Sequence, residues 1–404
     1  MRRAMRMRRF ILFSLLYLAM VGDSPGAQAQ TTHPVTEPTA PGLQVHEWAV
    51  FVLDGFDNQL NPDGKVLSTL PAFVNSHRQA AMQSLERPFP VGVIRIVGTA
   101  DSKVDVKIEK IAGTFLTSWP TAQTRSNQLL WQDLRVADAA GAVPLEKVSD
   151  DNWFNQLRES DSAYLMSPEG PPEQFLLYDI EMPYDSPLKA TSKPDGTVDC
   201  KNLGEVPLHD LVLYRTTHDT LMQASVGDLG DGGPSTRPTT APTTAPTGRV
   251  VAHLAAAPST QPAELASSWK QTLSSAGMTD AEAGVAVQII AQYAFDPHSL
   301  TAVYRMDDAE FDRLLPLEVV PQPQSITRVG LVIVRNFDAS ATDEIDDLIA
   351  QLGDPVWSKR QAAYDALKAL GPAAQPRLRL ATGNKDVEIA WRAERLLATP
   401  AQQP

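Results

Sequence analysis

Cysteine is almost absent from this sequence. The 404 residues contain a single one, Cys200, so no internal disulfide can form, and the fold must be held together by burial and hydrogen bonds. A lipid anchor would need a cysteine at the signal cleavage site, and none lies there. No histidine accompanies Cys200 in a pattern typical of cysteine enzymes, so we expect an incidental thiol.

Long apolar runs and positive charge are scarce as well. Residues 10–21 form the one extended apolar run, which is too short for a bilayer-spanning helix of about 20 residues. The chain has 35 Lys and Arg against 48 Asp and Glu, a formal net charge of −13. This balance disfavours nucleic acids and anionic membranes, which bind through clustered Lys and Arg. Basic proteins, cationic ligands or divalent ions are better candidates, and solubility outside the cell explains the charge equally well.

Local catalytic motifs are missing too. There is no Gly-x-x-x-x-Gly-Lys phosphate loop, and the single Gly-x-Ser-x-Gly, at 22–26, lies in the amino-terminal leader. Two Ser-x-x-Lys patterns begin at Ser186, in a proline-containing loop, and at Ser267, on an amphipathic segment. The Asp- and Gly-rich stretches "DNQLNPDG" and "GDLGDGG" do not fit a calcium loop. We therefore expect no cofactor.

The amino terminus has the features of a secretory signal peptide. Five arginines precede the apolar run at 10–21, and the small-x-small pattern Ala27-Gln28-Ala29 follows it. We expect Sec-type export, to the periplasm or beyond the cell, with cleavage after Ala29. Removal of residues 1–29 takes away five Arg and one Asp, so the formal charge falls from −13 to −17.

Two β-containing segments are expected in the mature chain. Residues 43–227 predict a β-sandwich-like domain, because runs such as "KVDVKIEKI" alternate polar and apolar side chains, and Pro194-Asp195-Gly196 predicts a hairpin turn. Residues 263–337 predict a small α+β segment that packs with this domain, with capping boxes at Thr279–Glu282 and Asp307–Glu310. The fold class is therefore α+β.

The two remaining segments differ in composition. Residues 228–262 include "DLGDGGPSTRPTTAPTTAPTG", which repeats Thr-Thr-Ala-Pro and has almost no large apolar side chain, and this is typical of an exposed, disordered linker. Residues 342–398 switch to a helical period, in four short pieces divided at 353–355, 371–372 and 383–384. This pattern predicts a HEAT-like helical module, although its length is little more than one repeat of about 40–47 residues.

Several motifs, taken in order, resemble a known family. They are "VHEWAVF", "TSWP", "LLWQDLRV", "FLLYDIEMP", "LVLYR", "TAVYRMDDAEFDRLLPLEVVPQP" and "RVGLVIVR". This order resembles uncharacterised secreted bacterial proteins that open with His-Glu-Trp-Gly-Thr-Phe, with Ala49-Val50 here in place of Gly-Thr. The match spans roughly 43–337, with the Thr/Pro-rich segment as an insertion. The tail is similar to HEAT-like tails of other secreted bacterial proteins. The resemblance implies an architecture and no activity.

The stretch "VHEWAVFV" is the first candidate site. Side chains alternate between the two faces of a strand, so His46 and Trp48 share one face and Glu47 lies on the other. His46 and Glu47 then cannot converge on one ion. The zinc-protease pattern His-Glu-x-x-His also fails, because the residue four after His46 is Val50. We expect a strand in which His46 and Trp48 either pack or line a groove.

His209 and His218, each followed by Asp, are the other histidines considered. Imidazole and carboxylate are ligands for zinc or iron, and a histidine oriented by an acid is a general base. No local pattern supplies the remaining ligands, so a metal site from His46, His209 and His218 is only a weak candidate, and none is expected.

The sequence favours an exported, non-catalytic binding or scaffold protein. Its helical module and β-rich domain would contact a protein partner, with His46, Trp48, Trp357 and Trp391 as binding candidates. The alternative is an extracytoplasmic hydrolase acting on a polymer, whose site is assembled from residues distant in sequence. Histidines close to carboxylates in one open pocket would favour that alternative.

Overall fold

A computed structural model describes most of the chain after residue 39. The described ranges are 40–54, 71–75, 91–98, 101–137, 144–149, 152–158, 163–168, 170–184, 186–193, 195–216, 220–232, 248–295, 299–335 and 339–398. The expected signal peptide, residues 233–247 of the Thr/Pro-rich segment and His218 lie outside these ranges. Among the described helices, none combines the length and the apolar character that a membrane crossing requires.

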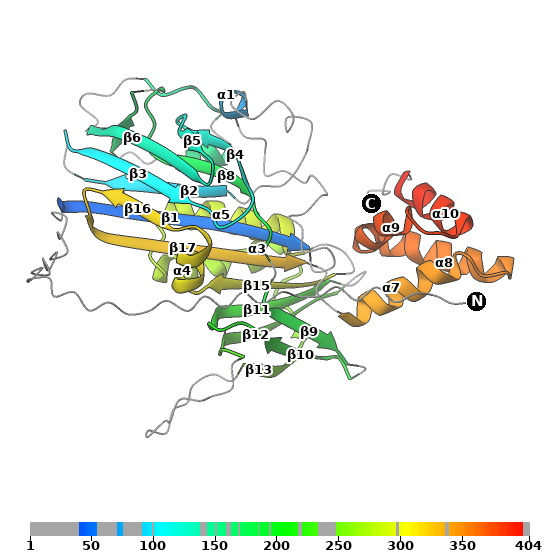
Figure 1. Ribbon diagram of the computed structural model, residues 1–404. Coiled ribbons are helices and arrows are strands. Elements are labelled where there is room, and N and C mark those ends of the chain that lie inside the picture. Colours follow the sequence, from blue (N-terminus) through cyan, green and yellow to red (C-terminus); the bar gives the residue numbers. More distant parts are fainter. Residues whose placement is uncertain are drawn as a thin grey trace, which may run out of the picture. The chain divides into compact units, whose positions relative to one another are not determined.

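The fold is mixed α and β, and its largest element is a nine-stranded sheet (Figure 1). The strands, in spatial order, are β14 (Ala255–Ala256), β12 (Leu221–Leu229), β11 (Leu208–Thr216), β15 (Leu300–Met306), β17 (Pro323–Arg335), β1 (Ala40–Asp54), β2 (Val91–Val97), β8 (Leu176–Glu181) and β4 (Thr114–Trp119). β1 and β17 run parallel, and the other neighbours in this sheet are antiparallel. Strands from 43–227 and from 263–337 therefore share one sheet.

Two smaller sheets complete the β structure. One contains β16 (Leu317–Val320), β3 (Lys103–Glu109), β6 (Gln128–Ala137) and β5 (Gln123–Arg125), with β7 (Tyr164–Met166) also paired to β6. The other contains β13 (Arg249–His253), β10 (Thr197–Asn202) and β9 (Leu188–Ser192). The predicted alternation in β3 is confirmed, because Val104, Val106 and Ile108 are buried. The predicted hairpin is also confirmed: β9 and β10 pair antiparallel, and Gly196 in the turn has φ +83°.

Both faces of the nine-stranded sheet are buried. Ala49 and Phe51 of β1 join a core with strands of the smaller sheets. Trp48 and Val50, on the opposite face, pack in a second core with the helices α2 (Trp153–Gln156), α3 (Pro262–Ser267), α4 (Trp269–Ser275) and α5 (Asp280–Tyr293). A strand covered on both faces reads as a nearly continuous apolar run, as "VFVL" does here.

The two predicted capping boxes had different outcomes. At α5 the box is present, since Thr279 accepts from the Glu282 backbone and the Glu282 side chain accepts from the Thr279 backbone. At α6 (Asp308–Leu314), Asp307 caps through the Ala309 N–H instead, and Glu310 binds Arg313. The second box was therefore wrong, because an ion pair within α6 engages the carboxylate that would have completed it.

The carboxyl-terminal region is helical and has its own core. It contains α7 (Ala339–Gln351), α8 (Trp357–Leu370), the 3₁₀ turn Gly371–Ala374, α9 (Gln375–Ala381) and α10 (Val387–Ala398), coloured orange to red in Figure 1. Leu352, Leu367, Leu378 and Leu396 are among the residues of this core, which is separate from the two cores of the sheets. The breaks lie where glycine and proline predicted them. The small α1 (Ala72–Asn75) is the remaining described helix.

Candidate functional site

β1 carries the triplet His46-Glu47-Trp48. Glu47 and Trp48 are buried, and His46 is half-buried. Trp48 packs in the core that contains the helices, whereas Glu47 points to the opposite face of the sheet and meets Tyr178. The alternation predicted from the sequence is confirmed. His46 and Glu47 therefore cannot act together on one ion or one proton.

Glu47 is the centre of a buried ion-pair network. Tyr178 of β8 donates to one carboxylate oxygen at 2.7 Å, and Arg328 of β17 donates to the other at 2.5 Å. Arg328 also donates to Asp312 and lies over the Phe311 ring, 4.1 Å from its centroid. Both oxygens of Glu47 are thus engaged by charged or phenolic donors.

Burial dominates the electrostatics of this network. It raises the pKa of Glu47, although the nearby Arg328 charge acts in the opposite direction. Burial, followed by the Glu47 charge, raises the pKa of Tyr178 well above its ordinary value. For Arg328 burial lowers the pKa, but the Glu47 charge and further contacts outweigh it and leave the pKa raised. Such pKa directions are typical of a buried structural ion pair. Both carboxylate oxygens of Glu47 already accept hydrogen bonds within the protein.

His46 makes its contact on the other face of the sheet. Its Nδ1 lies 3.3 Å from the carbonyl oxygen of Gly277, just before α5. Arg95 of β2 is directly opposite His46 in the ladder, and its Nε lies 3.7 Å from the Glu282 carboxylate. The same Glu282 completes the helix cap at Thr279. His46 and Arg95 thus attach the start of α5 to the sheet.

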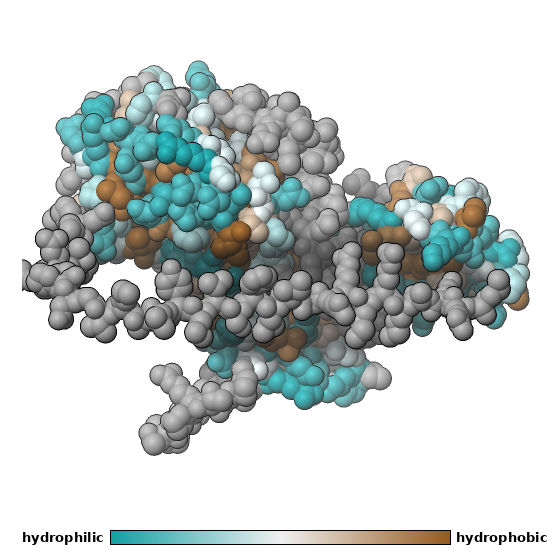
Figure 2. Space-filling view, in the orientation of Figure 1, coloured by the Kyte–Doolittle hydropathy of each residue, from teal (hydrophilic) through white to brown (hydrophobic). Residues whose placement is uncertain are grey.

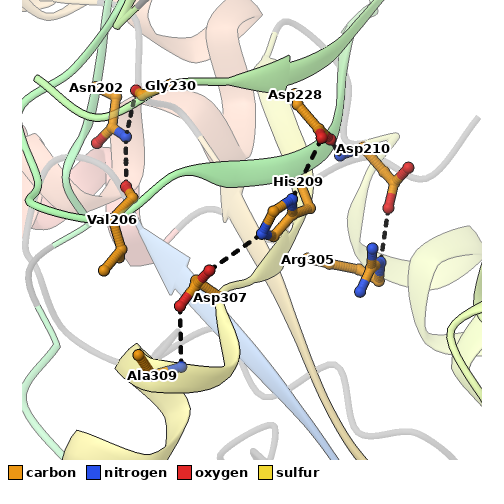
Figure 3. Close-up of polar contacts among 9 residues, drawn as sticks. All are labelled: Asn202, Val206, His209, Asp210, Asp228, Gly230, Arg305, Asp307 and Ala309. Carbon is orange, nitrogen blue, oxygen red and sulfur yellow. Dashed lines mark hydrogen bonds and ion pairs between the residues drawn. The ribbon is translucent and has the colours of Figure 1, made fainter. Parts of the chain in front are cut away.

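His209, on β11, lies between two carboxylates (Figure 3). Its Nε2 is 3.2 Å from Asp307, and its Nδ1 is 3.5 Å from Asp228 of β12. Asp307 also accepts the Ala309 N–H at 2.9 Å and so caps α6. The imidazole is about a quarter exposed, at 26%. His209 therefore connects two neighbouring strands with the start of a helix.

Strand β11 has a β-bulge at Asp210, the residue directly after His209. Both ladders of β11 shift register at this point, and Asp210 has φ +54°, which is rare for a residue with a side chain. The Asp210 N–H donates to Asp228, while its carboxylate accepts from Arg305 at 2.6 Å. The bulge therefore directs the side chains of His209 and Asp210 to different partners, as Figure 3 shows.

His46 and His209, the two proposed metal ligands within the described ranges, are not brought together. β15 and β17 separate His209 on β11 from His46 on β1, which corresponds to about 14 Å at the usual strand spacing. Asp228 and Asp307 approach opposite ring nitrogens of His209, so they do not converge on one ion. Within the described ranges, no group of three or more His, Cys, Asp or Glu side chains could hold a metal ion.

A polar cavity of about 360 Å³ lies beside the bulge. Asp210 and Arg305 line it, together with residues along α4 such as Gln271, Thr272 and Ser275. His209 is not part of its lining. The carboxylate contacts of His209 and this cavity therefore do not form a single open site. Cys200, in β10, is fully buried within the core of the sheets.

The seven tryptophans fall into two groups. Trp357, at the first position of α8, is 64% exposed, and Trp391, in α10, is 49% exposed. The others are buried at 1–2% exposure, namely Trp48, Trp119, Trp131, Trp153 and Trp269. Apolar patches (brown) break up the hydrophilic surface of the helical region in Figure 2. Of the four candidate binding residues, these two tryptophans alone present a large surface to solvent.

Sequence reasoning missed the partners that define these sites. Arg328 lies 281 residues from Glu47, and Asp307 lies 98 residues from His209. No spacing rule connects residues so far apart. A signal did exist for Asp307, because its position at a helix start predicted a cap, but a cap does not disclose a second partner.

Comparisons with known proteins give little further information. No protein-family model matches the sequence, and no curated protein is significantly similar to it. Among solved structures, the chain is similar to "Yeast delta-COP-I mu-homology domain complexed with Dsl1 WxWxV peptide". The identity is 8%, the match covers 74% of this chain and 97% of that chain, and the TM-score is 0.26. A likeness this weak does not establish a common fold.

Proposed function

We propose that this chain is an exported, non-catalytic binding or scaffold protein that contacts a protein partner through its carboxyl-terminal helices and its β-rich part. The exposure of Trp357 and Trp391 is the observation that carries the proposal. Burying a large apolar side chain is worth about 1.5–3 kcal/mol, and tryptophan is enriched among the residues that dominate binding energy. Two exposed tryptophans in one small helical region, beside five buried ones, favour a docking surface.

We further propose that α7–α10 form HEAT-type helix pairs beside a sandwich-like β body. The starts of α8 and α10 support a repeated unit. Asp354 accepts the Val356 N–H at 2.8 Å, and Asn384, likewise three residues before its helix begins, accepts the Asp386 N–H at 2.9 Å. Such repeats stack side by side and present extended surfaces, which suits binding rather than catalysis.

Export is part of the proposal. It is supported by the arginines, apolar run and Ala-Gln-Ala site of residues 1–29, and by the resemblance to secreted bacterial proteins. Amino-terminal sequencing of the protein recovered outside the cytoplasm tests it directly. A mature chain that begins at Gln30 is the expected result, and a full-length cytoplasmic chain would contradict it.

Site-specific crosslinking in the producing cell tests the binding role. A photoreactive amino acid replaces Trp357 or Trp391, and a control replaces Asp365, which is exposed about two turns further along α8. We expect the two tryptophan positions to crosslink to the same protein and Asp365 to give no such product. Equal yields at all three positions, or none, would count against a specific docking surface.

The hydrolase alternative has one observation in its favour, the 3.2 Å contact between His209 and Asp307. An acid that orients a histidine is common at catalytic sites. Both ring nitrogens already face carboxylates, however, and His209 does not line the neighbouring cavity. If the chain hydrolyses a polymer from this position, His209→Gln abolishes turnover while the melting temperature changes little. If it is a binding protein, the purified chain shows no turnover to lose.

A further inference from the structure

Trp357 and Trp391 lie on one surface formed by α8 and α10. Arg360 follows Trp357 by three residues, and Glu388 precedes Trp391 by three, so each pair shares a helix face. Arg360 Nε and the Glu388 carboxylate are 3.6 Å apart, which joins the two faces. A Cβ added to Gly353 would lie 2.9 Å from the Asp386 carboxylate, so the first turns of both helices are adjacent.

The charge between the two tryptophans is positive. Glu388 is shared by two arginines, because Arg392 Nε also donates to it at 2.7 Å. Arg395 adds a third guanidinium, which lies over the Trp391 ring at 5.4 Å from the centroid, and the Arg392 guanidinium lies 6.0 Å from the same centroid. Arg360 and Arg392 thus contact the Glu388 carboxylate, and Arg392 and Arg395 lie beside the exposed Trp391 ring.

The stretch from α8 to α10 has the same sign, whereas α7 before it is acidic. Residues 357–398 contain eight Lys and Arg against four Asp and Glu, whereas the whole chain has 35 against 48. A positive surface within an acidic chain attracts an acidic partner and repels a basic one. Arginine stacked on a ring still presents its N–H groups to a carboxylate. Charge and shape at this surface therefore complement a carboxylate next to an apolar side chain.

We infer that this surface, which we call the tryptophan–arginine surface (Trp357, Arg360, Glu388, Trp391, Arg392 and Arg395), binds an acidic peptide segment of a partner protein. An aliphatic or aromatic side chain of that segment packs between Trp357 and Trp391, and its flanking carboxylates bind Arg392 and Arg395. The inference rests on the proposed binding function and adds the chemistry of the partner.

Fluorescence quenching of the mature, full-length chain tests this inference. Only Trp357 and Trp391 are exposed, so iodide quenching reports on them without any labelling. The probes are three synthetic peptides of equal length, free of Trp and Tyr, in which Leu alternates with Glu, Gln or Lys. We expect the Glu/Leu peptide to protect both tryptophans at a concentration about tenfold lower than the Gln/Leu peptide, because contacts to charged groups are worth about 1.5–3 kcal/mol. The Lys/Leu peptide should not protect.

Two substitutions at the surface provide opposite expectations. Arg395→Gln should remove most of the preference for the Glu/Leu peptide. Glu388→Gln should strengthen its binding several-fold, because it frees Arg360 and Arg392 from their shared carboxylate. Lys368→Gln, on the same helix as Trp357 but outside this ion-pair group, is the matched control and should change binding little.

The outcomes separate this inference from the function on which it rests. Equal protection by the Glu/Leu and Gln/Leu peptides, or no protection by either, overturns the acidic partner. The crosslinking at positions 357 and 391 still decides the binding role. Stronger protection by anionic lipid vesicles or by DNA than by the Glu/Leu peptide also overturns the inference, because the surface would then recognise another class of molecule.

Discussion

Tyr178 donates a 2.7 Å hydrogen bond to Glu47, and 131 residues of chain separate the two. The ring of Tyr178 crosses above Gly92 on the strand between them, where the lack of a side chain makes room for it. The glutamate of "VHEWAVF" therefore has a structural role: it balances the charge of Arg328 inside the protein.

Truncation of Glu47 should destabilise the fold strongly. Glu47→Ala leaves the buried Arg328 without this partner, and breaking a buried ion pair costs about 3–5 kcal/mol. Glu47→Gln should cost less than half as much, because it still accepts the Tyr178 hydroxyl, and because the raised pKa of Glu47 shows that burial disfavours the charged form. Urea unfolding monitored by circular dichroism measures both. Equal losses would show that the charge of Glu47, and not its shape, is what matters.

Gly92→Ala should displace the Tyr178 ring. A Cβ at this position would lie 1.9 Å from the ring, which no rotation of a methyl group can relieve. We expect a loss of about 1–3 kcal/mol, as for other overpacked cores. The double variant Gly92→Ala, Tyr178→Leu should lose less than the two single changes added together, because the smaller side chain removes the clash. Strict additivity would contradict the close contact.

Alkaline pH should unfold the protein as buried tyrosines ionise. Burial raises the pKa of Tyr304 to about 12 and also raises the pKa of Tyr178 and Tyr214. The folded state therefore holds these protons more tightly than the unfolded state. This stabilisation is complete below the ordinary tyrosine value near 10 and is lost as the pH rises towards 12. Absorbance at 295 nm should show these tyrosines ionising together with unfolding, whereas gradual ionisation of a folded chain would refute the burial.

The stability of the fold should depend more on whether residue 210 tolerates a positive φ than on the charge of its side chain. The positive φ of Asp210 is tolerated by Asn and is unfavourable for β-branched residues. We expect Asp210→Val to destabilise by about 1–3 kcal/mol and Asp210→Asn by about 1 kcal/mol or less, since the pair with Arg305 is partly exposed. Thermal unfolding of the two variants compares them. Similar losses of stability in the two variants would show that the ion pair with Arg305, and not the backbone conformation, accounts for the contribution of Asp210.

The sequence predicted local structure better than long-range structure. The strand faces around Glu47, the hairpin at Asp195–Gly196 and the breaks between the carboxyl-terminal helices depend on residues close in the chain, and all are confirmed. The parallel pairing of β1 with β17 could not be foreseen, because alternation within a strand does not specify its neighbour. The box expected at Asp307–Glu310 was wrong, because Arg313 competes for Glu310.

The candidate site was less predictable than the fold. His209 was considered because Asp210 follows it in the sequence, but Asp228 and Asp307, and not Asp210, are its carboxylate partners. The bulge at Asp210 turns that side chain towards Arg305, and bulges have no reliable sequence signal apart from glycine. The sequence named Trp357 and Trp391 as binding candidates, but their exposure depends on how the helices pack, which the helical pattern does not specify.

The position of β17 has a consequence for how the protein is made. β17 is the last strand in the chain, yet it lies between β15 and β1, with four strands on each side of it in the nine-stranded sheet. Until residues 323–335 are present, the two halves of this sheet have no strand in common to join them. The order of synthesis therefore delays assembly of the sheet, and contacts so distant along the chain also make folding slow. A sheet that stays open until residues 323–335 have emerged is compatible with the export proposed above, because folding before passage through a narrow secretion channel would block transport.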